Sequence, residues 1–141
     1  MDNLGDEPQR TQRNTEKGLH AELTGRIIDA AMKVHTALGP GLLESAYEKC
    51  LLFELHRRDL QAESQVELPI SYDGVHIDAG YRMDLLVENT VIVELKAVQQ
   101  IEPIHTAQLL SYLKLANKPV GLLMNFHVVH PKEGIKRLVN T

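Results

Sequence analysis

The chain has 141 residues, of which 43% are hydrophobic and 24% are charged, and these values are typical of one globular domain. No apolar run approaches the roughly 20 residues that a membrane span requires, the polar N-terminus does not resemble a secretory signal, and the lone Cys50 excludes an internal disulfide, so we expect a cytoplasmic protein. The net charge of −4 argues against a protein that coats nucleic acid, although an enzyme needs only a local basic rim.

Residues 1–14 are polar with almost no apolar anchor, and we expect a flexible tail there. From about residue 15, apolar side chains recur every three or four positions, which predicts a helix with one apolar stripe. Gly39-Pro40-Gly41 ends this helix, because glycine accepts a left-handed cap and proline cannot continue the hydrogen-bond ladder. Residues 15–141 are therefore expected to form a single domain.

A second helix is predicted at residues 43–56. Glu44 and Tyr47 lie three residues apart on it and therefore share a face. Taken alone, this pattern indicates an exposed first-turn glutamate that complements the helix dipole, beside a core tyrosine.

Residues 65–72 are predicted to form a strand, in which Pro69 indicates a sheet edge. Tyr72-Asp73-Gly74 is typical of a hairpin turn that leads back toward the next strand. Gln65 and Glu67 alternate away from the apolar face, and we expect them to be exposed to solvent rather than to reach a site on a neighbouring strand.

The most apolar part of the chain, GYRMDLLVENTVIVELKA at residues 80–97, predicts a central hairpin. Its strands are expected at residues 81–87 and 91–97, with turn-prone residues between them. Charged groups inside such strands are costly unless they are paired or bound to a metal, and the interior of this hairpin contains Asp84, Glu94 and Lys96.

The length of the hairpin connection decides where these charges point. A three-residue connection centred on Asn89 places Asp84 opposite Glu94 and Arg82 opposite Lys96, whereas a two-residue connection sends Asp84 and Glu94 to opposite faces. Two adjacent carboxylates cannot both ionise cheaply. A hard divalent cation with oxygen ligands removes this penalty, and a lysine beside it can handle the proton of a water molecule.

Glu102-Pro103 predicts the start of another helix, which runs to about residue 116. The core stripe of this helix is expected to consist of Ile104, Ala107, Leu110 and Leu113. A separate face carries His105, Gln108 and Tyr112, and taken alone it indicates a solvated polar stripe.

The remaining segment predicts two more strands. Residues 120–125 form a short buried strand, so the preceding helix completes a crossover that is expected to be parallel and right-handed. A turn follows at residues 130–134, and a final strand is predicted at residues 135–139.

Three motifs in this order resemble one family. Asp84, followed after nine residues by Glu94-Leu95-Lys96, resembles the D…ExK signature of the PD-(D/E)XK nuclease superfamily. GLLESAY at residues 41–47 is similar to the motif that names the GxxExxY family, a small bacterial branch of that superfamily. QLLSY at residues 108–112 is similar to the QxxxY helix motif of RecB-like nucleases. The resemblance spans roughly residues 18–125.

The resemblance implies a fold and an activity. The fold would be an α/β restriction-endonuclease-like core, a central mixed sheet flanked by helices in the order α-α-β-β-β-α-β. The activity would be hydrolysis of phosphodiester bonds with Mg²⁺ or Mn²⁺, on nucleic acid and on DNA more than RNA. We expect no membrane partner. A homodimer is compatible with this interpretation. Candidates for a basic rim are Arg57, Arg58, Lys114, Lys118, Lys132, Lys136 and Arg137.

The resemblance also implies roles for individual residues. Asp84, Glu94 and the backbone carbonyl of Leu95 would hold the metal, and Glu44 would supply a third carboxylate. Lys96 would act on the attacking water or on the transition state. The residues implied to contact the substrate are Gln108, Tyr112, Tyr47 and His105.

Two other interpretations stay open. A protein with the same fold could keep the carboxylates as a metal-stapled core and bind nucleic acid or protein without catalysis. Alternatively, Glu94 and Lys96 could form ion pairs with Arg82 and Asp84 on a solvated face of the sheet.

Overall fold

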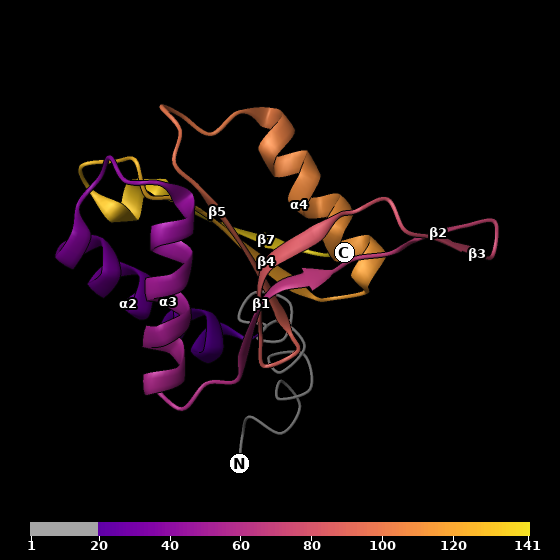
Figure 1. The fold of residues 1–141 in the computed structure, drawn as a ribbon, viewed down its shortest axis with the longest axis horizontal. Helices are drawn as coiled ribbons and strands as arrows, with labels where there is room; N and C mark the ends of the chain where they lie inside the picture. The colour runs from indigo at the N-terminus through magenta and orange to yellow at the C-terminus, as the bar shows by residue number, and fades with distance from the viewer. Residues whose placement is uncertain (1–19) are drawn as a thin grey trace, which may run out of the picture.

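The structure is a computed structural model that describes residues 20–141, so the expected tail at residues 1–14 and the helix start near residue 15 lie outside the described part. The elements in Figure 1 are, in chain order, α2 (Ala21–Leu38), α3 (Glu44–Arg57), β1 (Ala62–Glu67), β2 (Ile70–Tyr72), β3 (Val75–Ile77), β4 (Arg82–Val87), β5 (Val91–Lys96), α4 (Pro103–Ala116), β6 (Val120–Asn125), the 3₁₀ helix η1 (Pro131–Gly134) and β7 (Ile135–Val139). Within the described part, no helix combines the length and apolarity needed to cross a membrane.

Five strands form one sheet in the order β1-β4-β5-β6-β7, and β2 and β3 form a separate two-stranded ribbon. Neighbouring strands of the sheet are antiparallel except β5 and β6, which run parallel and are connected through α4. The predicted mixed sheet, the parallel crossover and the final strand are therefore confirmed. The elements of the expected order are all found, with the ribbon inserted between β1 and β4.

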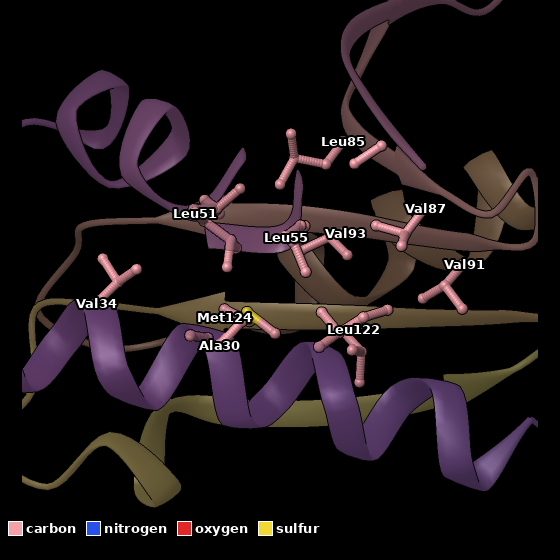
Figure 2. Close-up of a cluster of buried hydrophobic side chains, with 14 of the residues drawn as sticks. Ala30, Val34, Leu51, Leu55, Leu85, Val87, Val91, Val93, Leu122 and Met124 are labelled. Carbon is pink, nitrogen blue, oxygen red and sulfur yellow. The ribbon is translucent and has the colours of Figure 1, made fainter. Parts of the chain in front are cut away.

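Helices cover both faces of the sheet, with α2 and α3 on one side and α4 on the other (Figure 1). A smaller apolar core lies beneath α4, and a larger one lies beneath α2 and α3. Because full burial of one Val or Leu contributes about 1.5–3 kcal/mol, these cores stabilise the sheet that positions the polar groups described below. Figure 2 shows side chains of the larger core, including Ala30, Val34, Leu51, Leu55, Leu85, Val87, Val91, Val93, Leu122 and Met124.

The strand predicted at residues 65–72 is interrupted at Leu68 and Pro69. Pro69 has no N–H to donate to a ladder, so the chain leaves the sheet there and continues as β2. The ribbon of β2 and β3 extends away from the sheet (Figure 1), and its base is fixed by a hydrogen bond from the N–H of Leu68 to the carbonyl of Tyr81 (2.9 Å). The predicted turn at its tip is confirmed, with Asp73 and Gly74 both at positive φ.

The predicted core stripe of α4 is confirmed at Leu113 and Leu110 and is wrong at Ile104 and Ala107, which are exposed. The buried residues are Leu109, Tyr112 and Leu113, whereas Ile104 is 70% exposed. The helix carries apolar residues around much of its circumference, so spacing alone does not select the inner face. That face is set by β6, where a Cβ added at Gly121 would lie 3.0 Å from a methyl carbon of Leu109.

Candidate active site

The candidate site lies at the open end of the β4–β5 hairpin. Val87 pairs with Val91, so the connection is the predicted three-residue loop 88–90. Regular pairing continues to Leu85 and Val93 and stops there, although each strand extends three residues further. Beyond that point the backbone N–H and C=O groups of the two strands no longer pair with each other.

Two carboxylates replace the missing ladder bonds. The N–H of Asp84 donates to Oε2 of Glu94 (2.9 Å), and the N–H of Leu95 donates to Oδ2 of Asp84 (2.8 Å). Buried backbone N–H groups require an acceptor, and here each acid supplies one for the opposite strand. These crossed hydrogen bonds place the Asp84 and Glu94 side chains next to each other, as the three-residue connection predicts.

Ionising both acids is unfavourable in this environment. Glu94 is only 5% exposed, and burial, followed by the charge of Asp84, raises the pKa of Glu94 to about 8. Burial also raises the pKa of Asp84, against the opposing effects of the Leu95 N–H and the charge of Lys96. Buried, mutually repelling acids of this kind are found at functional sites.

The interpretation of these acids as members of a solvated ion-pair network is wrong. Arg82 pairs with Glu67 (3.5 Å), and within residues 20–141 no ion pair joins a cationic side chain to Asp84 or Glu94. Because Glu94 is also buried, its charge lacks the solvation that this interpretation requires.

Lys96 lies at the end of β5, where its charge lowers the pKa of both acids. Its backbone is held by β6, since the carbonyl of Lys96 accepts a hydrogen bond from the N–H of Phe126 (2.9 Å). The buried side chain of Asn125 secures the next turn, accepting from the N–H of Val98 (3.1 Å) and donating to its carbonyl (2.9 Å). Asn125 thus fixes the chain that follows Lys96, a role that sequence reasoning missed.

Two acids of α3, Glu44 and Glu48, differ in how they lie relative to the acid pair. Glu44 is exposed in the first turn of α3, whereas Glu48 is half-buried one turn later. The charge of Glu48 helps to raise the pKa of Glu94, while the charge of Glu44 acts on Glu48. The two positions are four residues apart, about 6 Å along the helix axis. The role of Glu44 at a metal stays a prediction, and Glu48 is the acid of α3 whose charge acts on Glu94.

Gln65 connects Glu48 to the site. It is exposed, as expected, yet its amide donates to both carboxylate oxygens of Glu48 (2.9 and 3.1 Å) and its hydrogen bond to Asp84 lowers the pKa of that acid. The pairing of β1 with β4 skips Gln65, whose φ of 54° is rare for a residue other than glycine. Such local irregularities re-aim side chains next to active sites, and alternation along a regular strand does not reveal them.

Tyr47 has a structural role in place of the implied contact with substrate. Its side chain is fully buried and stacks on Phe126, with ring centroids 4.6 Å apart. Its hydroxyl donates to the carbonyl of Gly39 and accepts from the N–H of Leu42. Tyr47 therefore closes the turn before α3, and its hydroxyl is occupied within the fold.

The remaining predicted residues lie on α4. Burial raises the pKa of Tyr112, and the charge of Glu94 raises it further. Tyr112 packs in the core beneath α4 with Met83 and Ile92, which flank the acids on β4 and β5. Gln108 lines a cleft together with Tyr112. His105 lies at the start of the helix, where Nδ1 accepts a hydrogen bond from the N–H of Glu102 (2.9 Å) in a capping box.

The acid pair has the donor chemistry of a magnesium site. Among residues 20–141, no three His, Cys, Asp or Glu side chains are grouped so that they could hold a metal by themselves. Mg²⁺, however, binds through one or two carboxylates and retains several waters. Asp84 and Glu94 fit this ligand set, because a cation would offset the repulsion that raises their pKa values.

The mixed sheet, the helices on both faces and the acids at the hairpin end define an α/β protein of the restriction-endonuclease-like type. Residues 21–138 match the family model of the PD-(D/E)XK nuclease superfamily, and the chain belongs to this superfamily. Neither the search of curated proteins nor the search of solved structures found a match. Membership indicates a nuclease-like function, and divalent metals and nucleic acid are the general partners of the superfamily.

Proposed function

We propose that this protein hydrolyses phosphodiester bonds of nucleic acid, DNA rather than RNA, with Mg²⁺ or Mn²⁺ held by Asp84, Glu94 and the backbone carbonyl of Leu95. The observation that carries this proposal is the pair of crossed hydrogen bonds between the two acids and the opposite strands. When bound, the cation lowers the pKa of a coordinated water and neutralises charge that develops on the phosphoryl oxygens.

Lys96 acts on the attacking water in this proposal. Its charge lowers the pKa of both acids, which supports a place for Lys96 at the pair. As an ammonium group it would orient the water or stabilise the phosphoryl charge, and as a neutral amine it would accept the proton of the water. Glu48 takes the part first expected of Glu44 and adjusts the charge at the site, and Gln65 holds it in position. Residues of this supporting kind orient the groups that bind the metal.

Gln108 and Tyr112 steady the backbone of the substrate. Both lie on the side of α4 that borders the acid pair, as the effect of Glu94 on Tyr112 supports. His105 assists from the first turn of the same helix, where it also caps the helix.

The motifs also support finer assignments. We place the chain in the RecB-like branch and in the GxxExxY family, because Gly41 and Tyr47 build the turn before α3 and the Gln108–Tyr112 face borders the site. We further propose that residues 15–141 form one cytoplasmic nuclease domain that acts as a homodimer.

A second candidate function is a non-catalytic module that binds nucleic acid or protein. One observation favours it: both acids already serve as backbone acceptors, and no third acid among residues 20–141 completes a preformed metal cluster. In such a module the pair would serve to join β4 to β5. Asp84→Ala separates the two functions, because an enzyme loses metal-dependent cleavage whereas a binding module retains its affinity.

The proposal is tested by incubating the protein with single-stranded, duplex and structured DNA and RNA, with and without Mn²⁺. We expect cleavage that requires Mn²⁺ and is lost in Lys96→Ala. Circular dichroism of Lys96→Ala serves as the folding control. If every substrate remains intact with the wild-type protein and Mn²⁺, the enzymatic proposal is overturned.

A further inference from the structure

An apolar cleft of about 320 Å³ opens beside the candidate site, between α4 and the start of β4. The side chains that form it include Ile70, Tyr81, Ile104, Gln108, Tyr112 and Leu115. A concave surface lined mainly by apolar and aromatic side chains, with a few polar groups, is typical of a ligand site.

The phase of α4 explains why the cleft is apolar. Ile104 and Leu115 are 70% and 40% exposed because the helix packs on the sheet through Leu109 and Leu113, which leaves these two side chains at the cleft. Across the cleft, Tyr81 is 43% exposed and meets Tyr112 edge to face, with ring centroids 6.0 Å apart. The cleft is therefore lined by two aromatic rings and by exposed aliphatic side chains of α4.

Tyr112 connects the cleft to the two strands that carry the acid pair. It lines the cleft and also packs in the core beneath α4, together with Met83 and Ile92. Met83 precedes Asp84 on β4, and Ile92 lies two residues before Glu94 on β5. The cleft therefore borders the strands that hold the acids, and a nucleotide bound at the acids would extend along the same face.

The chemistry of the lining selects which part of a nucleotide enters. None of the lining side chains is a carboxylate, an ammonium or a guanidinium group, so the cleft has no charge with which to pair a phosphate. It offers ring faces and aliphatic surface for stacking, together with the amide of Gln108 and the hydroxyl of Ser111 for the polar edge of a base. These features fit a flat, neutral heterocycle.

We propose that this cleft binds an unstacked nucleobase adjacent to the phosphate at the acid pair, so that the protein acts on single-stranded or locally unpaired nucleic acid. This inference rests on the proposed function. In a continuous duplex the faces of the bases are covered by their neighbours and cannot enter a side-chain cleft. Aromatic stacking of single-stranded bases tolerates any sequence, so the cleft selects strand state and not base identity.

Tyrosine fluorescence provides a readout that does not depend on cleavage. The chain has no tryptophan and four tyrosines, two of which, Tyr81 and Tyr112, line the cleft. The full-length protein is titrated in EDTA with a thymidine oligonucleotide and with an abasic strand of the same length. We expect quenching and tighter binding with the base-bearing strand, and weaker binding of the same sequence when it is paired in a duplex.

Substitutions assign the effect to the cleft. Tyr81→Ala should weaken binding of the thymidine strand roughly 5- to 100-fold, because stacking on one aromatic ring contributes about that factor, and should leave binding of the abasic strand unchanged. Tyr81→Phe should retain wild-type affinity. The matched control is Tyr72→Ala, since Tyr72 is an exposed ribbon tyrosine outside the cleft lining. Ile104→Ser tests the same prediction at a side chain too exposed to support folding.

Several outcomes would overturn the inference: equal affinity for base-bearing and abasic strands, equal losses for both strands in Tyr81→Ala, or an Ile104-dependent self-association that fills the cleft with a second copy. If duplex is cleaved and Tyr81→Ala does not change the rate, the nucleobase inference is overturned while the proposed nuclease function stands. Binding that depends on the bases, without Mn²⁺-dependent cleavage, would support the nucleobase site and overturn the proposed nuclease activity.

Discussion

Two glutamates of this protein are buried to the same extent and have opposite surroundings. Glu54 on α3 and Glu94 on β5 are each 5% exposed. Burial alone would raise the pKa of Glu54, but hydrogen bonds from Arg58 and Arg57 lower it below its ordinary value. The cationic partners of Glu54 are Lys33 (3.4 Å), Arg57 (2.8 Å) and Arg58 (3.1 Å).

Glu94 has the reverse environment. The charge that affects Glu94 most is that of another acid, Asp84, and burial together with that charge raises the pKa of Glu94 to about 8. A buried acid whose charge is compensated joins helices or strands, whereas an uncompensated acid retains the capacity to bind a cation. The surroundings of a buried acid, more than its burial, therefore indicate its role. Arg57 and Arg58, expected in a basic rim, are engaged with Glu54.

The strongest test of this contrast replaces each acid with its amide. Glu94→Gln should reduce Mn²⁺-dependent cleavage by roughly 10²- to 10³-fold, the usual loss for one preorganised electrostatic group, since the amide oxygen can still accept from the N–H of Asp84 and preserve the hairpin. Glu54→Gln should leave the rate per folded molecule unchanged. Initial rates at equal concentrations of folded protein measure both. Equal losses in the two variants would contradict the contrast.

Metal binding should stabilise the folded protein through the acid pair, Asp84 and Glu94, and not through Glu54. At a Mn²⁺ concentration of about 100 times Kd, the free energy of unfolding should rise by about 2.7 kcal/mol in the wild-type protein. Differential scanning fluorimetry should show this rise in Glu54→Gln and not in Asp84→Asn. A full response to Mn²⁺ in Asp84→Asn would exclude the acid pair as the metal site.

The two glutamates should also give opposite dependences of stability on pH in EDTA. The raised pKa of Glu94 means that the folded state keeps a proton which the unfolded state releases, so stability is lost as pH rises from 4.5 to about 8, by at most about 1.4 kcal/mol per pH unit. The lowered pKa of Glu54 means that its contribution is present above pH 4.5 and is lost as pH falls through the folded pKa. Urea unfolding from pH 3 to 8 checks both signs.

The variants separate these contributions. Glu94→Gln should remove the loss of stability between pH 4.5 and 8, and Glu54→Gln should reduce stability near neutral pH more than in acid. Slopes of the same sign in the two difference curves would show that the surroundings of the two acids do not differ as described.

The smallest expected effect concerns the residue that positions Glu48. Gln65→Ala should weaken Mn²⁺ binding about tenfold, at the low end of the range for groups that orient metal ligands, because Gln65 is itself exposed. Gln61→Ala is the matched control, since the hydrogen bonds of Gln61 to Glu88 are made by its backbone. Isothermal titration calorimetry measures both affinities. A loss in Gln61→Ala as large as in Gln65→Ala would show that the effect is not specific to the Gln65 side chain.

The fold and the acid pair were predictable because strands and connections obey short-range rules. The three-residue connection and the two-residue period of a strand are sufficient to bring Asp84 opposite Glu94. The same rules gave the parallel crossover through α4 and the final strand.

The rest depended on tertiary contacts. Which acid of α3 approaches the pair is decided by one turn of helix, and both Glu44 and Glu48 are compatible with its spacing. The face that α4 turns inward is selected by Gly121 on β6, and the direction of Gln65 by its positive φ. None of these contacts produces a periodic pattern in the sequence from which it could be predicted.

The crossed hydrogen bonds at the hairpin end give the site a spectroscopic signature of its own. Since each acid is the acceptor for a peptide N–H, whatever engages both carboxylates also acts on the amide protons of Asp84 and Leu95. Deuterium uptake at these two positions should therefore follow occupancy of the site without any substrate being present. The ladder amides at the closed end, near Val87 and Val91, provide the internal reference on the same two strands.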